Sequence, residues 1–498
     1  MATKRDLVEA YSFSRRRLVT AFVSGAPGGR EVEPSRPGRA LAGGIALTVL
    51  VLAAGAVLGF LKPRPDAGWA DRGGFVVAEG TVQLYLVQND EGDDDPVLIP
   101  VVNTVSARLI VGEDLDPVTV PQSEIDRYEV IEGIGIPNAP VTTPSDSALV
   151  EDGWTSCTAP GAGVRTAVTS TPQVDLVTEQ SAFVRSGESY YVVTPGQPAA
   201  ATGEVRYFRM KLPSDPEDLN RVLTNLRGPG LEDVVEVPSR WLDMLPAGPA
   251  LNAAAFDFGG ASFSGQVPGL TDAEGQPLAA GTLVTYQGED AVVGSDGYWP
   301  LSEFASAVYA ALPGRAAPVE VDELPGTRGS NPYPDDVWPG AVPAALGGGV
   351  TADLCAVLQT HADEPPTVVL GVRPTPEVAA GDLAPDTHVG YVERARGSVV
   401  RVGGFTATAA EDAFLIDPQG IRYALPGDSL QRLGYGRDQA RVVPTAWVET
   451  FSCGVTLTRD EALKTLSAER QAQQSCGSAE ADATEATDGT DGAGEGSG

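Results

Sequence analysis

One uncharged apolar stretch, residues 40–61 (ALAGGIALTVLVLAAGAVLGFL), constrains the fold of this chain more than any other feature. A helix of about 20 apolar residues crosses the roughly 30 Å hydrocarbon layer of a bilayer, and this stretch has 22 residues. A buried core helix is the alternative, but core helices of this length usually keep a polar face. The sequence therefore predicts a single N-terminal transmembrane helix over residues 40–61.

The flanking charges predict the orientation of this helix. Residues 1–39 carry eight basic and four acidic side chains, and short basic flanks stay in the cytoplasm. We therefore expect a single-pass protein of the cytoplasmic membrane, with its N-terminus inside and residues 62–498 outside. A cleaved signal peptide is the alternative. Its basic region would be unusually long, and no small-residue cleavage motif follows Leu61.

Two shorter features near the membrane suggest contacts with partners. Gly55 and Gly59 form a GxxxG pair, which lets another helix approach closely in lipid; general glycine enrichment is the alternative. Residues 3–24 predict a basic amphipathic helix with Leu7, Tyr11, Leu18 and Phe22 on one side. Three roles fit this helix: binding to anionic lipid headgroups, docking on a cytoplasmic partner, or a topology signal with no binding role.

Charge and cysteine content limit the chemistry of the outer region. The net charge of −33 repels nucleic acid, so we expect no nucleic-acid partner. All four cysteines, Cys157, Cys355, Cys453 and Cys476, follow the apolar stretch, where an oxidising compartment favours two disulfides. Three pairings are possible, and the spacing alone does not choose among them. The chain has no CxxC motif and no His/Cys cluster, so we expect no metal site.

A weak repeat recurs beyond the membrane. Each copy has two apolar strands joined by a turn, then a short helix, then a strand that ends in a V-x-V-P-like pattern. The four copies include the strands LYLV (84–87), YYVV (190–193), DAVVG (290–294) and AFLI (413–416). Their helices are expected at 103–112, 213–226, 302–312 and 426–436, with Asn103, Ser214 and Ser302 as N-caps. Because one copy is too small to bury its own core, the copies must pack on each other or on another domain.

The remaining segments complete an α+β architecture. Two Pro- and Gly-rich segments separate the copies, and each contains one cysteine, which suggests a discontinuous β-rich central domain surrounded by four small α/β repeats. We expect the following organisation: a cytoplasmic basic segment (1–39), the transmembrane helix (40–61), a linker and repeat 1 (62–122), the central domain (123–188 and 326–388), repeat 2 (189–254), repeat 3 (255–325), repeat 4 (389–466), and a C-terminal segment with a disordered acidic tail (467–498).

Catalytic motifs are missing from the sequence. It has no GxxxxGK[ST] phosphate loop, no GxSxG nucleophile elbow, and only two histidines, His361 and His388, which cannot form HExxH. We therefore expect no catalytic residues and no cofactor. An extracytoplasmic hydrolase acting on nucleotide or cell wall is one alternative, because paired carboxylates occur in any acidic chain. A wall-binding module is another.

Several longer stretches together resemble one family. They are RDLVEAYSFSRRRLVTAFVSG (5–25), LIPVVNTVSARLIVG (98–112), GIGIPNAP (133–140), GWTSC (153–157), VPSRWLDMLPAGPALN (237–252) and RYALPGDSLQRLGYG (422–436). This combination resembles EccB, a core membrane component of the type VII (ESX) secretion system of actinobacteria. The resemblance covers nearly the whole chain.

The resemblance implies a large outer part with four repeats around a central domain. It also implies a homo-oligomeric, membrane-embedded complex with EccC, EccD and EccE, of which EccC is the motor ATPase. A family disulfide in the central domain matches Cys157 and Cys355. Cys453 and Cys476 are extra, and we expect them to form the second pair. ATPase activity has been attributed to the family, but the missing phosphate loop does not support it here, and we expect a structural subunit.

Overall fold

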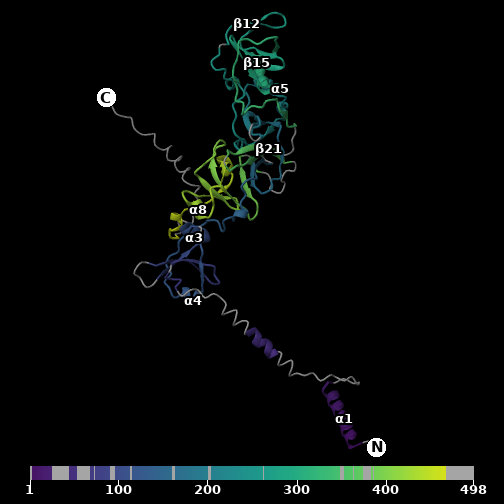
Figure 1. Cartoon of the computed structure of the whole chain (residues 1–498), viewed down its shortest axis with the longest axis vertical. Helices are drawn as coiled ribbons and strands as arrows, with labels where there is room; N and C mark the ends of the chain where they lie inside the picture. Colours follow the sequence, from purple (N-terminus) through teal and green to yellow (C-terminus); the bar gives the residue numbers. More distant parts are fainter. Residues whose placement is uncertain are drawn as a thin grey trace, which may run out of the picture. The chain divides into compact units, whose positions relative to one another are not determined.

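The computed structural model describes residues 3–24, 44–52, 68–71, 73–89, 96–112, 115–159, 163–199, 203–261, 263–347, 353–362, 364–373, 383–384 and 386–466. They belong to two units, Met1–Asp66 and Ala67–Gly498, which are treated separately below. Figure 1 shows the chain coloured along its sequence. The expected acidic tail lies outside the described residues.

The first unit contains the expected N-terminal helix, α1 (Lys4–Ser24). Its apolar residues are exposed, and they include Leu7, Tyr11, Leu18 and Phe22. Residues 44–52 are also helical. Among the described residues, no helix is both long enough and apolar enough to span a membrane. The rest of the predicted span, including Gly55 and Gly59, lies outside the described residues, so the transmembrane helix and its packing pair remain predictions.

In the second unit, four sheets of the described residues share one strand order. Three consecutive strands pair antiparallel, a helix follows, and the next strand returns parallel to the first strand of the set. Repeat 1 consists of β1 (Gly74–Ala78), β2 (Leu84–Gln88), β3 (Val97–Val101), α3 (Thr104–Val111) and β4 (Val118–Val120). Repeat 2 consists of β8 (Gln180–Ser186), β9 (Ser189–Pro195), β10 (Tyr207–Lys211), α5 (Pro216–Asn225) and β11 (Val235–Glu236).

Repeats 3 and 4 follow the same plan. Repeat 3 consists of β14 (Leu283–Tyr286), β15 (Glu289–Val293), β16 (Gly297–Leu301), α7 (Glu303–Ala311) and β17 (Val319–Glu320). Repeat 4 consists of β23 (Ser398–Gly403), β24 (Ala413–Ile416), β25 (Ile421–Ala424), α8 (Ser429–Arg432) and β26 (Arg441–Pro444). A two-stranded sheet of β12 (Gln266–Thr271) and β13 (Pro277–Ala279) lies beside repeat 3 and shares its core.

Each repeat begins one strand earlier than the sequence pattern suggested. The expected hairpins are present, but β1, β8, β14 and β23 precede them. This additional strand gives the V-x-V-P-like segment a partner, because β4, β11, β17 and β26 each pair parallel with it. Parallel strands need a crossover connection, and the repeat helix supplies that connection.

The third strand of every repeat is covered on its outer edge. Repeat 3 adds β18 (Thr327–Arg328) and repeat 4 adds β27 (Ser452–Cys453), both parallel to the third strand. In repeats 1 and 2, isolated parallel bridges occupy this place, Leu98 with Val130, Val101 with Ile134, and Arg209 with Ala247. Such cover shortens the unpaired edges that promote sheet aggregation.

A six-stranded sheet takes strands from two distant parts of the chain. Its order is β22-β6-β5-β20-β21-β7. The strands are β5 (Trp154–Thr158), β6 (Val164–Val168), β7 (Asp175–Val177), β20 (Asp353–Gln359), β21 (Thr367–Arg373) and β22 (His388–Val392). We call it the central sheet. The limits of the central domain and the repeats remain a proposal.

Short elements connect these sheets. Helices α4 (Gln122–Ile125), α6 (Ser239–Leu242) and α9 (Thr445–Val448) directly follow the V-x-V-P-like strands of repeats 1, 2 and 4, and α10 (Arg459–Ala462) follows β27. The 3₁₀ turns are η1 (Asp146–Ala148), η2 (Leu231–Asp233) and η3 (Ala253–Ala255), and β19 (Ala344–Ala345) pairs with β8.

Helix starts agree with the expected N-caps in two cases and differ in one. Asn103 accepts a hydrogen bond from the Ser106 amide at 2.8 Å, and Ser302 accepts one from Ala305 at 3.1 Å. The expected cap Ser214 was wrong. Pro216 occupies the first turn of α5, a position proline favours, so the cap is Asp215.

The helix expected at 426–436 is also shorter than the pattern suggested, because α8 covers only Ser429–Arg432. Pro426 and Gly427 precede it, and Gly434 follows with a φ of 90°, a left-handed conformation that ends helices. Glycine and proline therefore restrict the helix to one turn.

The caps give a direct test with a matched control. Asp215 accepts hydrogen bonds from the amides of Glu217 and Asp218, at 3.0 and 3.1 Å. Asp215→Ala should lower the free energy of unfolding by about 1 kcal/mol, the usual value of an N-cap. Ser214→Ala should change it by less than about 0.5 kcal/mol. Urea unfolding of both variants measures the difference, and equal effects would contradict the assignment.

Candidate functional site

A disulfide joins the two middle strands of the central sheet. Cys157 on β5 and Cys355 on β20 lie directly opposite each other, with their Cα atoms 4.0 Å apart, and both are fully buried. The bond connects segments separated by 198 positions in the sequence. This is the disulfide that the family resemblance implied. Cys453 lies on β27 and is disulfide-bonded, but its expected partner Cys476 is outside the described residues, so that pairing remains a prediction.

Two buried tryptophans lie in the apolar core that repeats 2 and 4 share with the central sheet. Trp241 on α6 donates a hydrogen bond from Nε1 to the Ser156 carbonyl of β5 at 3.0 Å. Trp447 on α9 donates one from Nε1 to the Met244 carbonyl at 3.0 Å, and both indoles are fully buried. One apolar cluster contains these residues together with side chains of the central sheet and of both repeats. The three parts therefore share a single core.

Repeat 1 packs against repeat 4 through their helices. Helix α3 contacts α8 and α10, and one apolar cluster includes residues of both repeats. Arg432 of α8 donates from Nη1 to the carbonyls of Leu109 and Ile110, both at 3.3 Å. These carbonyls belong to the last turn of α3, where the helix leaves acceptors without internal partners. A cation is also favoured there by the helix dipole.

The buried residue Tyr435 adds a partly buried hydrogen bond to this interface. Its hydroxyl donates to the Pro144 carbonyl at 2.6 Å. Burial raises the pKa of Tyr435 to about 12, so the hydroxyl remains a donor throughout the neutral range. Residues 464–466 also reach repeat 1, because the Gly135 amide donates to the Lys464 carbonyl and the Leu466 amide donates to Gly133.

Repeats 2 and 3 use a similar helix contact. Helices α5 and α7 lie against each other, and one cluster contains apolar residues of both repeats. Arg221 of α5 donates from Nε to the carbonyl of Ala311, the last residue of α7, at 3.2 Å. Asn225 donates to the Ala307 carbonyl at 3.0 Å. In both helix contacts, an arginine of one repeat therefore satisfies the C-terminal end of the other repeat's helix.

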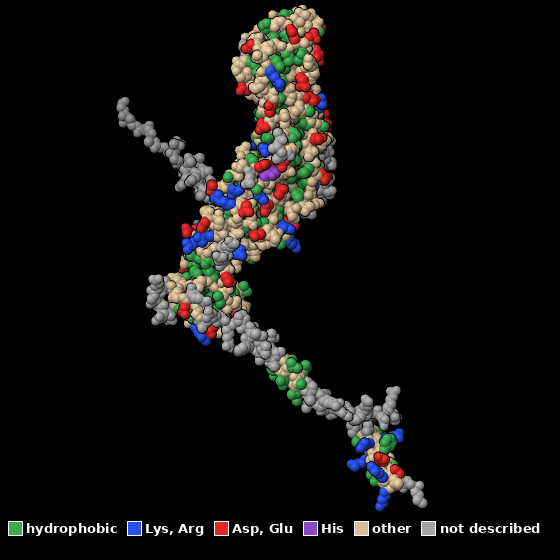
Figure 2. All heavy atoms as spheres, viewed as in Figure 1, with side chains coloured by type: hydrophobic (Ala, Val, Ile, Leu, Met, Phe, Trp, Pro, Cys, Tyr) green, Lys and Arg blue, Asp and Glu red, His purple; other side chains and the backbone are tan. Residues whose placement is uncertain are grey.

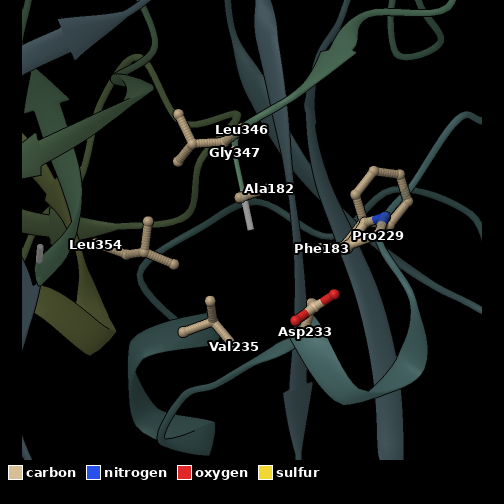
Figure 3. A pocket seen from close by; sticks show the side chains of 8 residues that line it. All are labelled: Ala182, Phe183, Pro229, Asp233, Val235, Leu346, Gly347 and Leu354. Atoms are coloured by element: carbon tan, nitrogen blue, oxygen red, sulfur yellow. The ribbon is translucent and has the colours of Figure 1, made fainter. Parts of the chain in front are cut away.

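Two pockets in the second unit do not resemble a substrate site. Figure 3 shows a pocket where repeat 2 meets the central sheet, with Asp233, Val235 and Leu354 among its lining residues. Its free volume is about 10 Å³, the space of roughly one water molecule. A wider groove of about 400 Å³ runs beside α5 and α7. Its charged residues bind within the protein, since Arg227 pairs with Glu303 at 2.8 Å and Asp290 accepts from Ser306.

Sequence reasoning found the cysteines but missed the interface residues. Trp241 and Trp447 were not identified as interface residues, and the contacts of Arg221 and Arg432 were not expected. The V-x-V-P pattern contained a usable signal, because each tryptophan is the third residue after the proline of that pattern. The arginines carry no local signal, because their acceptors lie 90 or more positions away in the sequence.

The disulfide should contribute strongly to stability. Removing a native disulfide typically costs about 2–5 kcal/mol, and this one closes a long loop in a buried sheet. We expect the double variant Cys157→Ala, Cys355→Ala to unfold at a clearly lower urea concentration than the native chain. Non-reducing peptide mapping should yield a Cys157–Cys355 peptide. A Cys355–Cys453 peptide, or an unchanged unfolding midpoint in the double variant, would contradict this assignment.

Comparisons with known proteins identify relatives. A family model described as "Type VII secretion system ESX-1, transport TM domain B" matches residues 1–468. The "ESX-1 secretion system ATPase EccB1" of Mycobacterium tuberculosis is 32% identical over 176 residues, which cover 32% of this chain and 34% of the relative. This match therefore spans about a third of that relative. The "ESX-2 secretion system ATPase EccB2" of the same species is 26% identical over 397 residues, 74% of this chain and 78% of the relative.

Solved structures agree on the fold. A chain of an intact ESX-5 inner membrane complex superposes with a TM-score of 0.58 at 21% identity, covering 94% of this chain and 96% of its own length. The EccB3 dimer of the ESX-3 core complex gives a TM-score of 0.57 at 22% identity, covering 79% of this chain and 100% of that chain. Because the family model matches almost the full sequence, the chain belongs to the EccB family of type VII secretion systems.

Proposed function

We propose that the chain is a non-catalytic structural subunit of a type VII secretion membrane complex. The observation that carries this proposal is how the central sheet and the four repeats of the second unit pack against one another. The central sheet shares one core with repeats 2 and 4, and repeats 1 and 3 are attached through paired helices. A fixed arrangement of this kind suits a scaffold, which must hold partner-binding surfaces at constant spacing.

The partners follow from the family. EccC, EccD and EccE type subunits are the proposed neighbours in the membrane, and a second copy of this chain is the proposed neighbour outside it. The likeness to a chain of an ESX-5 inner membrane complex and to an EccB3 dimer supports assembly of both kinds. Gly55 and Gly59 are the proposed contact points for a partner helix in the bilayer.

Nucleotide hydrolysis is the second candidate function, because the curated relatives are named ATPases. The sequence has no phosphate-loop motif. In that motif, the backbone amides of a glycine-rich loop and a lysine side chain bind the phosphates of the nucleotide. The pockets described above are too small or have their charged residues paired within the protein. These observations favour the structural role.

The proposed topology can be tested by cysteine labelling. Basic residues precede the predicted span, so residues 1–38 should be cytoplasmic and residues 65–498 outside. An impermeant maleimide added to intact cells should label Ser478→Cys and should not label Ser24→Cys. The wild-type chain provides the background. Labelling of Ser24→Cys without labelling of Ser478→Cys would reverse the topology.

Copurification tests the structural role. In mild detergent the tagged chain should elute in a complex of megadalton order with the other membrane subunits. Gly55→Leu or Gly59→Leu should reduce recovery of those subunits by about tenfold, the effect of losing ~1.4 kcal/mol of close helix packing. Ala53→Leu adds the same bulk on the opposite side of the expected helix and is the matched control.

Three results would count against parts of this proposal. Elution of the tagged chain as a small species would contradict membership of a large complex. Equal recovery with the glycine variants would show that Gly55 and Gly59 reflect only the high glycine content of the chain. Nucleotide turnover that follows the purified chain through successive columns, with the motor subunit absent, would favour the enzymatic candidate instead.

A further inference from the structure

Two hairpin turns from different parts of the second unit bring together one histidine and two glutamates. Glu204 lies in the turn between β9 and β10 of repeat 2, while His361 and Glu364 lie in the turn between β20 and β21 of the central sheet. One ligand atom from each residue lies within 4.8 Å of the other two. His361 Nε2 is 3.8 Å from a Glu204 carboxylate oxygen.

The backbone around this cluster is held in place. The turn of repeat 2 is closed by hydrogen bonds between Ala199 and Glu204 at 2.9 Å and between Gly203 and Ala199 at 2.7 Å. Strand β10 lies against β21, and Thr360 donates to the Glu151 carbonyl at 2.7 Å. Glu364 precedes Pro365, which restricts its backbone to extended conformations. The described residues next to the cluster are therefore held by backbone hydrogen bonds and by strand packing.

The imidazole nitrogen that faces the cluster needs a partner. Within the part of the chain that the structure describes, His361 Nε2 is buried and has no hydrogen-bond partner, although the side chain as a whole is 25% exposed. A buried polar atom left without a partner is unfavourable. A metal ion coordinated by Nε2 would remove this cost, and so would a hydrogen bond to Glu204.

The ligand set indicates which ion would bind. One imidazole nitrogen and two carboxylates are typical of Zn²⁺, whereas Mg²⁺ and Ca²⁺ prefer oxygen ligands alone. Zn²⁺ bonds of about 2.0–2.2 Å place tetrahedral ligand atoms about 3.4 Å apart. The nitrogen and the Glu204 oxygen are already close to that spacing, and Glu364 is exposed and can adjust its side chain.

The net charge of the chain also favours a cation. The chain carries a net charge of −33, and acidic side chains are spread over the visible face in Figure 2. Such a field raises the local concentration of divalent ions. We propose that Glu204, His361 and Glu364 form a binding site for a zinc-class divalent cation that links repeat 2 to the central sheet.

The test uses the full chain in detergent after removal of metals with EDTA. Titration with Zn²⁺ should show one saturable site above the weak background of exposed carboxylates, and Zn²⁺ should raise the thermal unfolding temperature. Co²⁺ in place of Zn²⁺ should give a visible absorption band from coordination by nitrogen and oxygen. His361→Asn should weaken Zn²⁺ binding at least tenfold and abolish the band.

The second histidine provides a matched control. His388 lies on β22, outside the cluster, where burial and the nearby Arg240 and Arg422 lower its pKa. His388→Asn should leave Zn²⁺ binding unchanged. Glu364→Gln changes an exposed side chain without affecting the core, so it should fold normally and still weaken binding several-fold.

Three outcomes would overturn the site. The first is the absence of stoichiometric binding in the wild-type chain, which would assign His361 to an ion pair with Glu204. The second is equal binding by wild type, His361→Asn and Glu364→Gln. The third is equal loss of binding in His361→Asn and His388→Asn.

Discussion

Burial of the repeat helices is the constraint on which the second unit depends. A repeat of four short strands and one helix has an apolar helix face that the repeat cannot cover alone. The chain solves this by pairing helices, α3 with α8 and α10, and α5 with α7. Repeats 1 and 4 therefore belong together, as do repeats 2 and 3. The central sheet then needs to hold only one member of each pair, and it contacts repeats 2 and 4.

The tryptophans follow this division. In repeats 2 and 4, the short helix after the V-x-V-P-like strand places Trp241 or Trp447 in the core shared with the central sheet. In repeat 1 the equivalent position, three residues after Pro121, is Glu124, which pairs with Arg127 near solvent at 2.8 Å. Among repeats 1, 2 and 4, this short helix therefore carries a large apolar residue only where the repeat contacts the central sheet. In these three repeats the residue type at this position distinguishes those that contact the central sheet from the one that does not.

Much of the local structure could be predicted from the sequence, because it depends on neighbouring residues. Turn residues indicated the hairpins, and Asn103 and Ser302 indicated two helix starts. Ser214 was wrong because the proline two positions later moves the cap to Asp215. The first strand of each repeat was missed because the repeated pattern was read from the next two strands, although the first strand pairs antiparallel with its neighbour in the sequence and parallel with the strand beyond the helix. The cluster of Glu204, His361 and Glu364 was missed because its turns are far apart in the sequence and come together where β10 packs against β21.

Residues 464–466 have a consequence for how the molecule forms. They pair with Gly133 and Gly135, which in turn extend the sheet of repeat 1 beyond β3. The most N-terminal sheet of this unit is thus completed by an isolated bridge from its most C-terminal described residues. Contacts between such distant segments slow folding, because a long loop must close first. The N-terminal end of a chain emerges first during synthesis. Repeat 1 therefore lacks the contact with residues 464–466 until nearly all of the unit has emerged. Completion of this edge then depends on the emergence of repeat 4, so an early stop in synthesis leaves an exposed strand where the full-length protein has a covered one.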